Sequence, residues 1–275
     1  MGSDNNNENG FKSLEGRHYS YGKEKTKTMT VDDFRKKTYQ YNSAAKEAIE
    51  PIHVFAAKTF GWVFLGALVT FLFAFFLSRN AGFKAAFLNA PKVMLYVPAI
   101  VLVVLTFIFS LFVFKVSPIV AKALYLVYAL IEGVTLSLYF MYFDVPTICF
   151  VFLIGAGMFG IMAALSYFLK WELSGLGMIL FVGLLAILLF TILNMIFFKM
   201  QIISLVICYI GLAIFLGYTA YDTSMLRNMY AYYASLDDDV MLKRCSIYGA
   251  FSLYLDFMAI IRYIFQILIL SKSSD

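Results

Sequence analysis

The sequence predicts an all-α integral membrane protein, a bundle of seven transmembrane helices. Composition is the first reason: 62% of the 275 residues are hydrophobic and only 14% are charged, whereas a soluble domain carries about a quarter charged residues. The second reason is a series of seven apolar runs, each long enough to cross about 30 Å of hydrocarbon as a helix. Most connections between the runs are short, so we expect successive helices to pack antiparallel.

Residues 1–50 precede the apolar runs and form a polar tail with nine Lys/Arg and eight Asp/Glu. The opening MGSDNNNENG lacks the basic-then-apolar order of a secretory signal, so we expect no cleavage, and its composition is typical of disorder. From Thr30 onward, apolar residues at three- and four-residue steps predict an amphipathic helix on the membrane surface. A soluble linker helix fits that pattern equally well. We therefore divide the chain into a tail, 1–50, and a seven-helix membrane domain, 51–275.

The seven predicted spans follow Pro51. The longest connection between them lies between the sixth and seventh runs, and it contains the acidic-then-basic stretch SLDDDVMLKR. The runs are 55–77, 93–114, 118–140, 147–169, 176–197, 202–221 and 246–270, with 222–245 as that longest connection.

Basic residues in the loops predict the orientation, because Lys and Arg accumulate on the cytoplasmic side. With the N-terminus inside, that side has the nine basic tail residues and Lys115, Lys122, Lys170, Arg227, Lys243 and Arg244, against Arg79, Lys84, Lys92, Lys199 and Lys272 outside. We expect a multi-pass protein with a cytoplasmic N-terminus, in a bacterial cell membrane or in an endomembrane such as the endoplasmic reticulum. The C-terminus lies outside if the last run spans fully, and inside if that run only dips into the membrane.

Several kinds of site are disfavoured by the residue types present. There is no CxxC pair and both histidines precede the first apolar run, so neither a zinc site nor a Ser-His catalytic dyad within the membrane is expected. The stretch GAGMFG, 155–160, matches a dinucleotide fingerprint in letters, but it lies in an apolar helix, where small residues favour helix packing. We expect no enzyme activity, no cofactor and no nucleic-acid partner. An aspartyl-type intramembrane protease ranks last among the alternatives.

Three acids lie in or at the edge of apolar runs: Glu132, Asp222 and Asp256. A charge at the centre of a membrane helix costs about 2.5–3.5 kcal/mol on insertion scales, so such a residue is a candidate functional site. Each acid shares a helical face with hydroxyl or aromatic residues, and the three faces together predict one interior cavity. The candidates for lining a pore are Glu132, Tyr128, Tyr218, Ser252 and Arg262.

Arg262 lies six residues after Asp256, which is about 240° around a helix, so these two are not a natural pair. Arg262 has three possible partners: backbone carbonyls, an acid on another helix, or the membrane interface, which its long side chain reaches by snorkelling. A structural and a functional role fit it equally well.

Asp222 and Asp256 have a chemistry of their own if they meet. Two carboxylates in a poorly hydrated site cannot both ionise cheaply, so the pair shares one proton. Protonated, the pair is a neutral clasp between two helices; deprotonated, it repels itself or takes up a cation, and Ca²⁺ prefers carboxylate oxygens. A purely structural clasp is the alternative.

Three segments, GYTAYDTSMLRN, ALIEGVTLS and SLYLDFMAIIRYI, resemble the transmembrane Bax inhibitor motif family of calcium leak channels. The resemblance covers roughly residues 55–270 and implies a seven-helix bundle with the last helix at its centre. It also implies that Asp222 and Asp256 are the pH-sensing gate and transient Ca²⁺ ligands. Family members have an arginine latch at the end of the second helix; Lys115 stands there, and lysine cannot make the bidentate contact of arginine.

The leading hypothesis is thus a pH-sensitive calcium leak channel, with Ca²⁺ and H⁺ as the moving ions and the bilayer as its surroundings. The second hypothesis is a regulatory membrane protein that acts on a membrane protease or a cell-death partner without a pore of its own. We expect a monomer.

Overall fold

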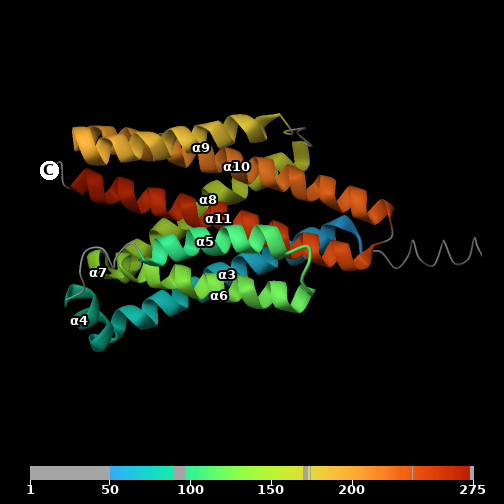
Figure 1. Ribbon diagram of the computed structural model, residues 1–275, viewed down its shortest axis with the longest axis horizontal. Coiled ribbons are helices and arrows are strands. Elements are labelled where there is room, and N and C mark those ends of the chain that lie inside the picture. Colours follow the sequence, from blue (N-terminus) through green and yellow to red (C-terminus); the bar gives the residue numbers. More distant parts are fainter. Residues whose placement is uncertain (1–49, 90–96, 170–172, 174, 237, 273–275) are drawn as a thin grey trace, which may run out of the picture. The chain divides into compact units, whose positions relative to one another are not determined.

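The computed structural model describes residues 50–89, 97–169, 173, 175–236 and 238–272. The ordered elements of these residues are helices, and no strand occurs among them (Figure 1). The helical membrane bundle predicted from composition is therefore confirmed. The polar tail before residue 50, including the amphipathic helix predicted from Thr30, lies outside the described residues, as does Asp237 of the acidic cluster.

Among the described residues, six helices are long and apolar enough to cross a membrane, with α6 and α7 counted as one span, so the chain is a multi-pass membrane protein. Within the predicted run 93–114, the described helix α5 has 16 residues, and a count of seven spans stays a prediction. The helices are α3 (Ile52–Arg79), α4 (Ala81–Asn89), α5 (Val97–Phe112), α6 (Pro118–Ser137), α7 (Tyr139–Tyr142), α8 (Val145–Leu169), α9 (Leu176–Leu193), α10 (Gln201–Ser235) and α11 (Asp239–Lys272).

Local sequence signals explain where several helices begin. Ser117 caps α6 by accepting a hydrogen bond from the amide of Val120, and Pro118 occupies the first helical position, which suits a residue without an N–H. Asp238 accepts a hydrogen bond of 2.9 Å from the amide of Met241 and so caps α11. Part of the acidic cluster therefore serves to start a helix.

The connection between the sixth and seventh runs is much shorter than predicted. We expected a loop over 222–245, but α10 continues to Ser235 and α11 begins at Asp239. The hydropathy of the sequence falls after Tyr221, but no helix-breaking Gly or Pro occurs before Gly249. Helix α10 can therefore continue beyond its apolar run. The helix thus outlasts its apolar run, and Asp222 lies inside a helix rather than at its end.

The turn between α9 and α10 is held by one side chain. A π-helical turn, Asn194–Phe198, ends at Lys199, whose φ of 49° is left-handed. The Asn194 amide donates to the Met200 carbonyl at 3.2 Å and to the Ser204 hydroxyl of α10 at 2.7 Å. Hydrogen bonding by Asn194 between helices, which the sequence favours, is observed.

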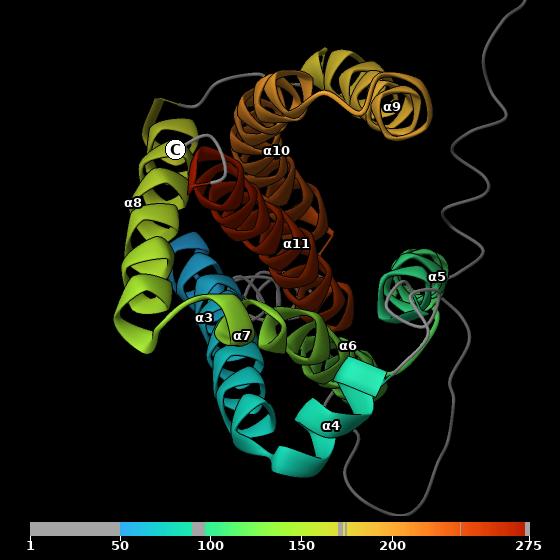
Figure 2. The same ribbon diagram turned by 90° about the vertical axis from the view of Figure 1, so that its left-hand side faces the viewer.

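Helix α11 lies at the centre of the bundle. It packs on α10, α3, α8 and α6, and Figure 2 shows it among these helices, with α9 on the outer side of α10. Sixteen of its residues are buried, which confirms the predicted central last helix. In contrast, α9 packs on α10 and α5 packs on α6, so both lie at the periphery. The central position of α11 places Asp256 and Arg262 in the interior.

Candidate functional site

Asp222 of α10 and Asp256 of α11 meet at the interface between these two helices. The two carboxyl groups interact electrostatically, and the Ser252 hydroxyl, one turn before Asp256, donates to Oδ2 of Asp222. Asp256 is almost completely buried, with 4% of its surface exposed. The two aspartates, thirty-four residues apart in the chain, thus come together, with Asp256 buried and Asp222 partly exposed.

A carboxylate can only accept hydrogen bonds, so a hydrogen bond between the two acids would require a shared proton. Within the described part of the chain, no hydroxyl, amide or cation donates to the buried Oδ2 atom of Asp256. A buried oxygen without a donor is costly, and a proton shared with Asp222, or a cation bound in its place, satisfies it.

The surroundings of the pair are aromatic and polar. Tyr218 interacts electrostatically with both carboxyl groups, and Tyr248 with Asp222. No salt bridge between either aspartate and a Lys or Arg occurs among the residues that the structure describes. Neither acid therefore has a fixed countercharge among the described salt bridges.

The polar contacts continue along the α10–α11 interface toward the α9–α10 turn. Gly211 of α10 allows the ring of Tyr263 to approach, since a Cβ at Gly211 would lie 2.4 Å from the ring. One turn earlier on α10, the Cys208 thiol donates to the Gln266 side-chain oxygen at 3.4 Å. Ser252, Asp256, Tyr263 and Gln266, which lie on one face of a helix by their spacing, thus all face α10.

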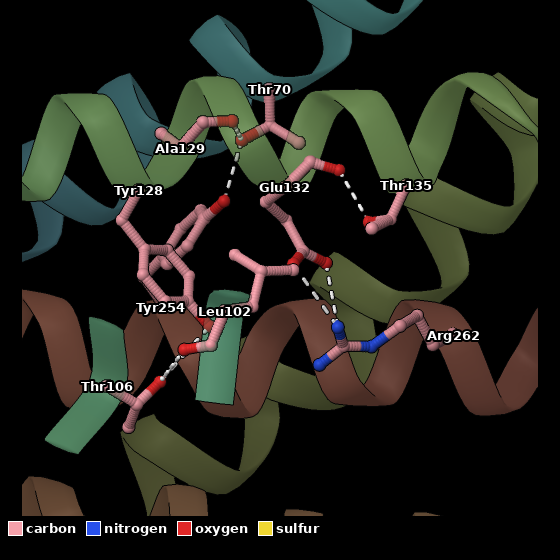
Figure 3. A network of polar contacts seen from close by, with 9 residues as sticks. All are labelled: Thr70, Leu102, Thr106, Tyr128, Ala129, Glu132, Thr135, Tyr254 and Arg262. Carbon is pink, nitrogen blue, oxygen red and sulfur yellow. Dashed lines mark hydrogen bonds and ion pairs between the residues drawn. The ribbon is translucent and has the colours of Figure 1, made fainter. Parts of the chain in front are cut away.

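Glu132 and Arg262 form a second polar centre, between α6 and α11 (Figure 3). Nη1 of Arg262 lies 2.9 Å from Oε1 and 3.2 Å from Oε2 of Glu132. The Glu132 side chain is 1% exposed and that of Arg262 is 35% exposed. Of the three partners considered for Arg262, the structure shows the acid on another helix.

Hydroxyl groups surround this ion pair (Figure 3). The Tyr254 and Thr70 hydroxyls are 2.6 Å apart, and the Thr70 hydroxyl also donates to the Ala129 carbonyl. The Tyr128 hydroxyl accepts from Thr106 at 3.4 Å. Tyr128 thus belongs to the Glu132 centre, while Tyr218 and Ser252 belong to the aspartate pair. The candidate residues form two centres on different faces of α11 instead of lining one cavity.

A pocket of about 850 Å³ lies between α9, α10 and α11. Its lining includes Phe215, Ala259 and Arg262. Ala259 follows Asp256 by one helical turn, so the pocket ends close to the aspartate pair without including it. A smaller pocket of about 340 Å³ lies near the start of α11, where Lys122, Asp239 and Ser246 contribute to its lining.

Lys115 lies just beyond α5 and is exposed, with its ammonium 5.9 Å from the centroid of the Phe112 ring. In the described residues no salt bridge joins it to Asp222, and its role as a latch stays a prediction. A different cationic side chain connects α11 to the segment just after α5: Nη1 of Arg244, on α11, donates a hydrogen bond of 2.8 Å to the Phe114 carbonyl. Sequence reasoning missed this contact, because a carbonyl acceptor has no side-chain signature.

The carboxylates suit a passing cation better than a resident one. Among the described residues, no group of three or more His, Cys, Asp or Glu side chains comes together. Ca²⁺ takes six to eight oxygen ligands, and two aspartates supply four at most, so water would complete the shell.

The GAGMFG stretch lies within α8, and a Cβ at Gly155 would lie 2.4 Å from the Ile261 side chain of α11. This supports packing over nucleotide binding at that glycine.

Comparison with known proteins gives one consistent result. The family profile described as "Inhibitor of apoptosis-promoting Bax1" matches residues 52–274. The inner membrane protein YbhL of Escherichia coli is 34% identical over 208 residues, which are 75% of this chain and 87% of YbhL. A protein of Deinococcus radiodurans is 30% identical over 234 residues, 84% of this chain and 97% of that protein. A protein of Borreliella burgdorferi is 34% identical over 218 residues, 78% and 90% of the two chains.

Proposed function

This chain belongs to the Bax inhibitor-1 family, and from that premise we propose that it is a pH-sensitive calcium leak channel gated by Asp222 and Asp256. The observation that carries the proposal is the buried carboxyl pair on α10 and α11, which contains no fixed countercharge among the described salt bridges. Acidic side chains in a membrane interior cost free energy, so a pair of them there indicates a functional site.

The two pockets suggest the route. One reaches Ala259, just after Asp256, and the other includes Ser246, ten residues before Asp256. Ten residues of helix measure about 15 Å. Helix α11 therefore has a pocket toward each end, with the closed pair between them. We propose that Ca²⁺ passes from one pocket to the other along α11 when the pair opens.

The gate works through one proton. At low pH the proton lies between the two carboxyl groups and holds α10 against α11. When the pH rises, the proton passes to water in one of the pockets, and the two neighbouring carboxylates then repel each other. Hydrated Ca²⁺ can then exchange part of its water for their oxygens. Leak is therefore expected to rise with pH and to fall as the pH drops.

Other titratable groups near the pair do not supply this response. Those that interact with it are tyrosines, Tyr218 of α10 and Tyr248 of α11, and a tyrosine hydroxyl ionises near pH 10 in water. Glu132 has Arg262 as its countercharge. The aspartates are thus the groups whose protonation changes the α10–α11 interface near neutral pH.

Calcium entry into liposomes that contain the purified full chain and an enclosed calcium dye tests the proposal. We expect flux without any other protein, because the proposed route lies within one chain. Dye signals equal to those of protein-free liposomes at pH 6, 7 and 8 would overturn it. The proposal gives the pair a gating role without catalysis and involves no bound cofactor; Ca²⁺ is the transported ion.

A bacterial cell membrane is the proposed location, since the name of the relative YbhL places that protein in an inner membrane. We propose a cytoplasmic N-terminus, on the loop charges. Protease digestion of intact spheroplasts gives the test: the tail should resist cleavage from outside, and its removal there would reverse the orientation.

The second candidate function is a regulatory membrane protein, which the description of the family favours by naming inhibition of a cell-death protein. This function needs a specific membrane partner and no ion flux. Pull-downs with the full chain and with a chain lacking residues 1–50 test it. A partner that depends on the tail would support this alternative, and identical captured proteins from both chains would argue against a tail-dependent version.

A further inference from the structure

The pocket between α9, α10 and α11 has chemistry that ion passage does not explain. Its lining carries two cationic side chains, Arg262 and Lys199, and no acid. Apolar residues form much of the remainder, among them Leu184, Ile207 and Ile269. A cavity with positive groups and an apolar wall suits an anion that carries a hydrocarbon chain.

Arg262 has unused hydrogen-bonding capacity toward this pocket. Both of its contacts with Glu132 use Nη1. In the described part of the chain no acceptor hydrogen-bonds Nε or Nη2 of Arg262, and 35% of the side chain is exposed. A guanidinium presents its donors in a planar fork that matches a carboxylate or a phosphate. The face of Arg262 opposite Glu132 can therefore bind a second anion.

The pocket is accessible from the bilayer. Helix α9 packs along α10, and Figure 2 shows α9 on the far side of α10 from the centre of the bundle. The outward residues of α9 are large and apolar, including Leu185 and Leu189, as expected for a surface in contact with lipid. The side of the pocket between α9 and α11 therefore faces hydrocarbon.

The depth of Arg262 distinguishes between two kinds of anionic lipid. The carbonyl of Leu270 accepts a hydrogen bond of 2.5 Å from Gln201, the first residue of α10, so Leu270 is level with that helix end. Arg262 lies eight residues earlier, or about 12 Å deeper along the helix, within a leaflet whose hydrocarbon is about 15 Å thick. The phosphate of a phospholipid, which is attached to a headgroup and two acyl chains, stays at the membrane interface. The small carboxylate of a single-chain fatty acid can reach the depth of Arg262.

We propose that this pocket binds a long-chain fatty acid taken from the bilayer. Its carboxylate accepts hydrogen bonds from Nε and Nη2 of Arg262, and its chain lies against Leu184 and Phe215 and leaves between α9 and α11. Arg262 then bridges two carboxylates, one from Glu132 and one from the ligand. This inference concerns binding alone, so it stands or falls independently of calcium flux.

Photocrosslinking tests the proposal on the purified full chain in nanodiscs of neutral lipid. The probe is palmitic acid with a diazirine in its chain, and peptide mass spectrometry locates the labelled residues. We expect label on residues of α9, α10 and α11 that line this pocket. Unlabelled palmitate should compete at least ten times more effectively than hexadecanol, which has the same chain without the charge.

Two matched variants in α9 keep the result independent of Arg262. Thr191 lines the pocket and Ile192, its neighbour, is exposed and does not. Thr191→Phe should reduce labelling at least fivefold by filling the pocket, and Ile192→Phe should leave it unchanged. Arg262→Gln should abolish the preference for palmitate over hexadecanol if the variant folds. Equal competition by hexadecanol, equal labelling of the two Phe variants, or competition by phosphatidylglycerol as strong as that by palmitate would each overturn the proposal.

Discussion

At the scale of single residues, the Glu132–Arg262 pair is asymmetric in its burial, since Glu132 is 1% exposed and Arg262 is 35% exposed. Removing either partner leaves the other charge unpaired. An unpaired Glu132 has no access to water, whereas an unpaired Arg262 can still be hydrated through the pocket that it lines. The two single substitutions should therefore differ in cost, although they remove the same contact.

We predict that Arg262→Gln lowers the free energy of unfolding by about 3–5 kcal/mol, the usual cost of breaking a buried ion pair. Glu132→Gln should cost about 1–3 kcal/mol. Thermal unfolding of both variants in the same detergent, followed by the loss of monodisperse protein, gives the order. Equal melting temperatures, or a lower one for Glu132→Gln, would contradict this account of the pair.

Gly211 controls the distance between α10 and α11 on the side of the aspartate pair toward the α9–α10 turn. A Cβ there would lie 2.4 Å from the Tyr263 ring, so Gly211→Ala must move the ring or separate the helices. We predict a loss of about 1–3 kcal/mol, as for other overpacked sites. Gly157→Ala is the control, because a Cβ at Gly157 meets nothing within 4 Å and alanine favours helix. Comparable unfolding temperatures for the two variants would show that this interface is loose.

At the scale of secondary-structure elements, α11 is tied to α3 by two hydroxyl contacts. The Thr59 and Ser246 hydroxyls are 2.9 Å apart, and those of Thr70 and Tyr254 are 2.6 Å apart. Hydrogen bonds between membrane helices contribute modestly on average, about 0.6 kcal/mol. Their main contribution here is to fix the position of α11 against α3, on the face of α11 away from α10.

Tyr254→Phe removes one of these contacts while keeping the buried ring. We predict a loss of about 0.5–1.5 kcal/mol in the free energy of unfolding, the usual contribution of one hydrogen bond. Tyr232→Phe serves as the control, since Tyr232 is 61% exposed. Steric-trap or denaturant unfolding measures the difference, and a Tyr254→Phe variant as stable as the wild type would contradict a tie between α3 and α11.

The elements themselves show what the sequence could predict. The apolar runs located the membrane helices, and helical spacing placed Ser252, Asp256, Tyr263 and Gln266 on one face, because both signals are local. The extension of α10 to Ser235 was missed because hydropathy reports only whether a segment lies in the membrane. A helix can continue beyond the membrane where the sequence contains no Gly or Pro to break it.

Partners across helices were less predictable. The choice of Glu132 as the partner of Arg262 depends on the rotation of α6 relative to α11, which no local pattern contains. The predicted single cavity failed for the same reason: Glu132 and the aspartates contact different faces of α11. Asp222 and Asp256 were paired correctly because two isolated membrane acids have few alternatives.

At the scale of the whole molecule, one central helix carries both polar centres. Asp256 meets α10 on one face of α11 and Arg262 reaches α6 from another. The pair Glu132–Arg262 has its own countercharge, while the aspartates rely on a proton. A change in pH should therefore move α10 relative to α11 and leave the contact between α6 and α11 in place.

An acid outside the spans provides a control for this pH dependence. A hydrogen bond from the Thr147 hydroxyl holds the pKa of the exposed Asp144 carboxyl below its ordinary value. Its contribution to stability is therefore present above its unfolded pKa and is lost only when the pH falls through the lower folded pKa. Asp144 stays ionised at neutral pH and should not take part in the response.

The pH profile of calcium flux in liposomes, compared between the wild type and the variants Asp222→Asn, Asp256→Asn and Asp144→Asn, tests the central claim most directly. The account predicts that flux through the wild type and Asp144→Asn rises at least fivefold between pH 6 and pH 8. An asparagine amide replaces the shared proton permanently, so Asp222→Asn and Asp256→Asn should give a low flux that does not change with pH. Flux through either aspartate variant that follows the wild-type profile would contradict the claim that this pair is the gate.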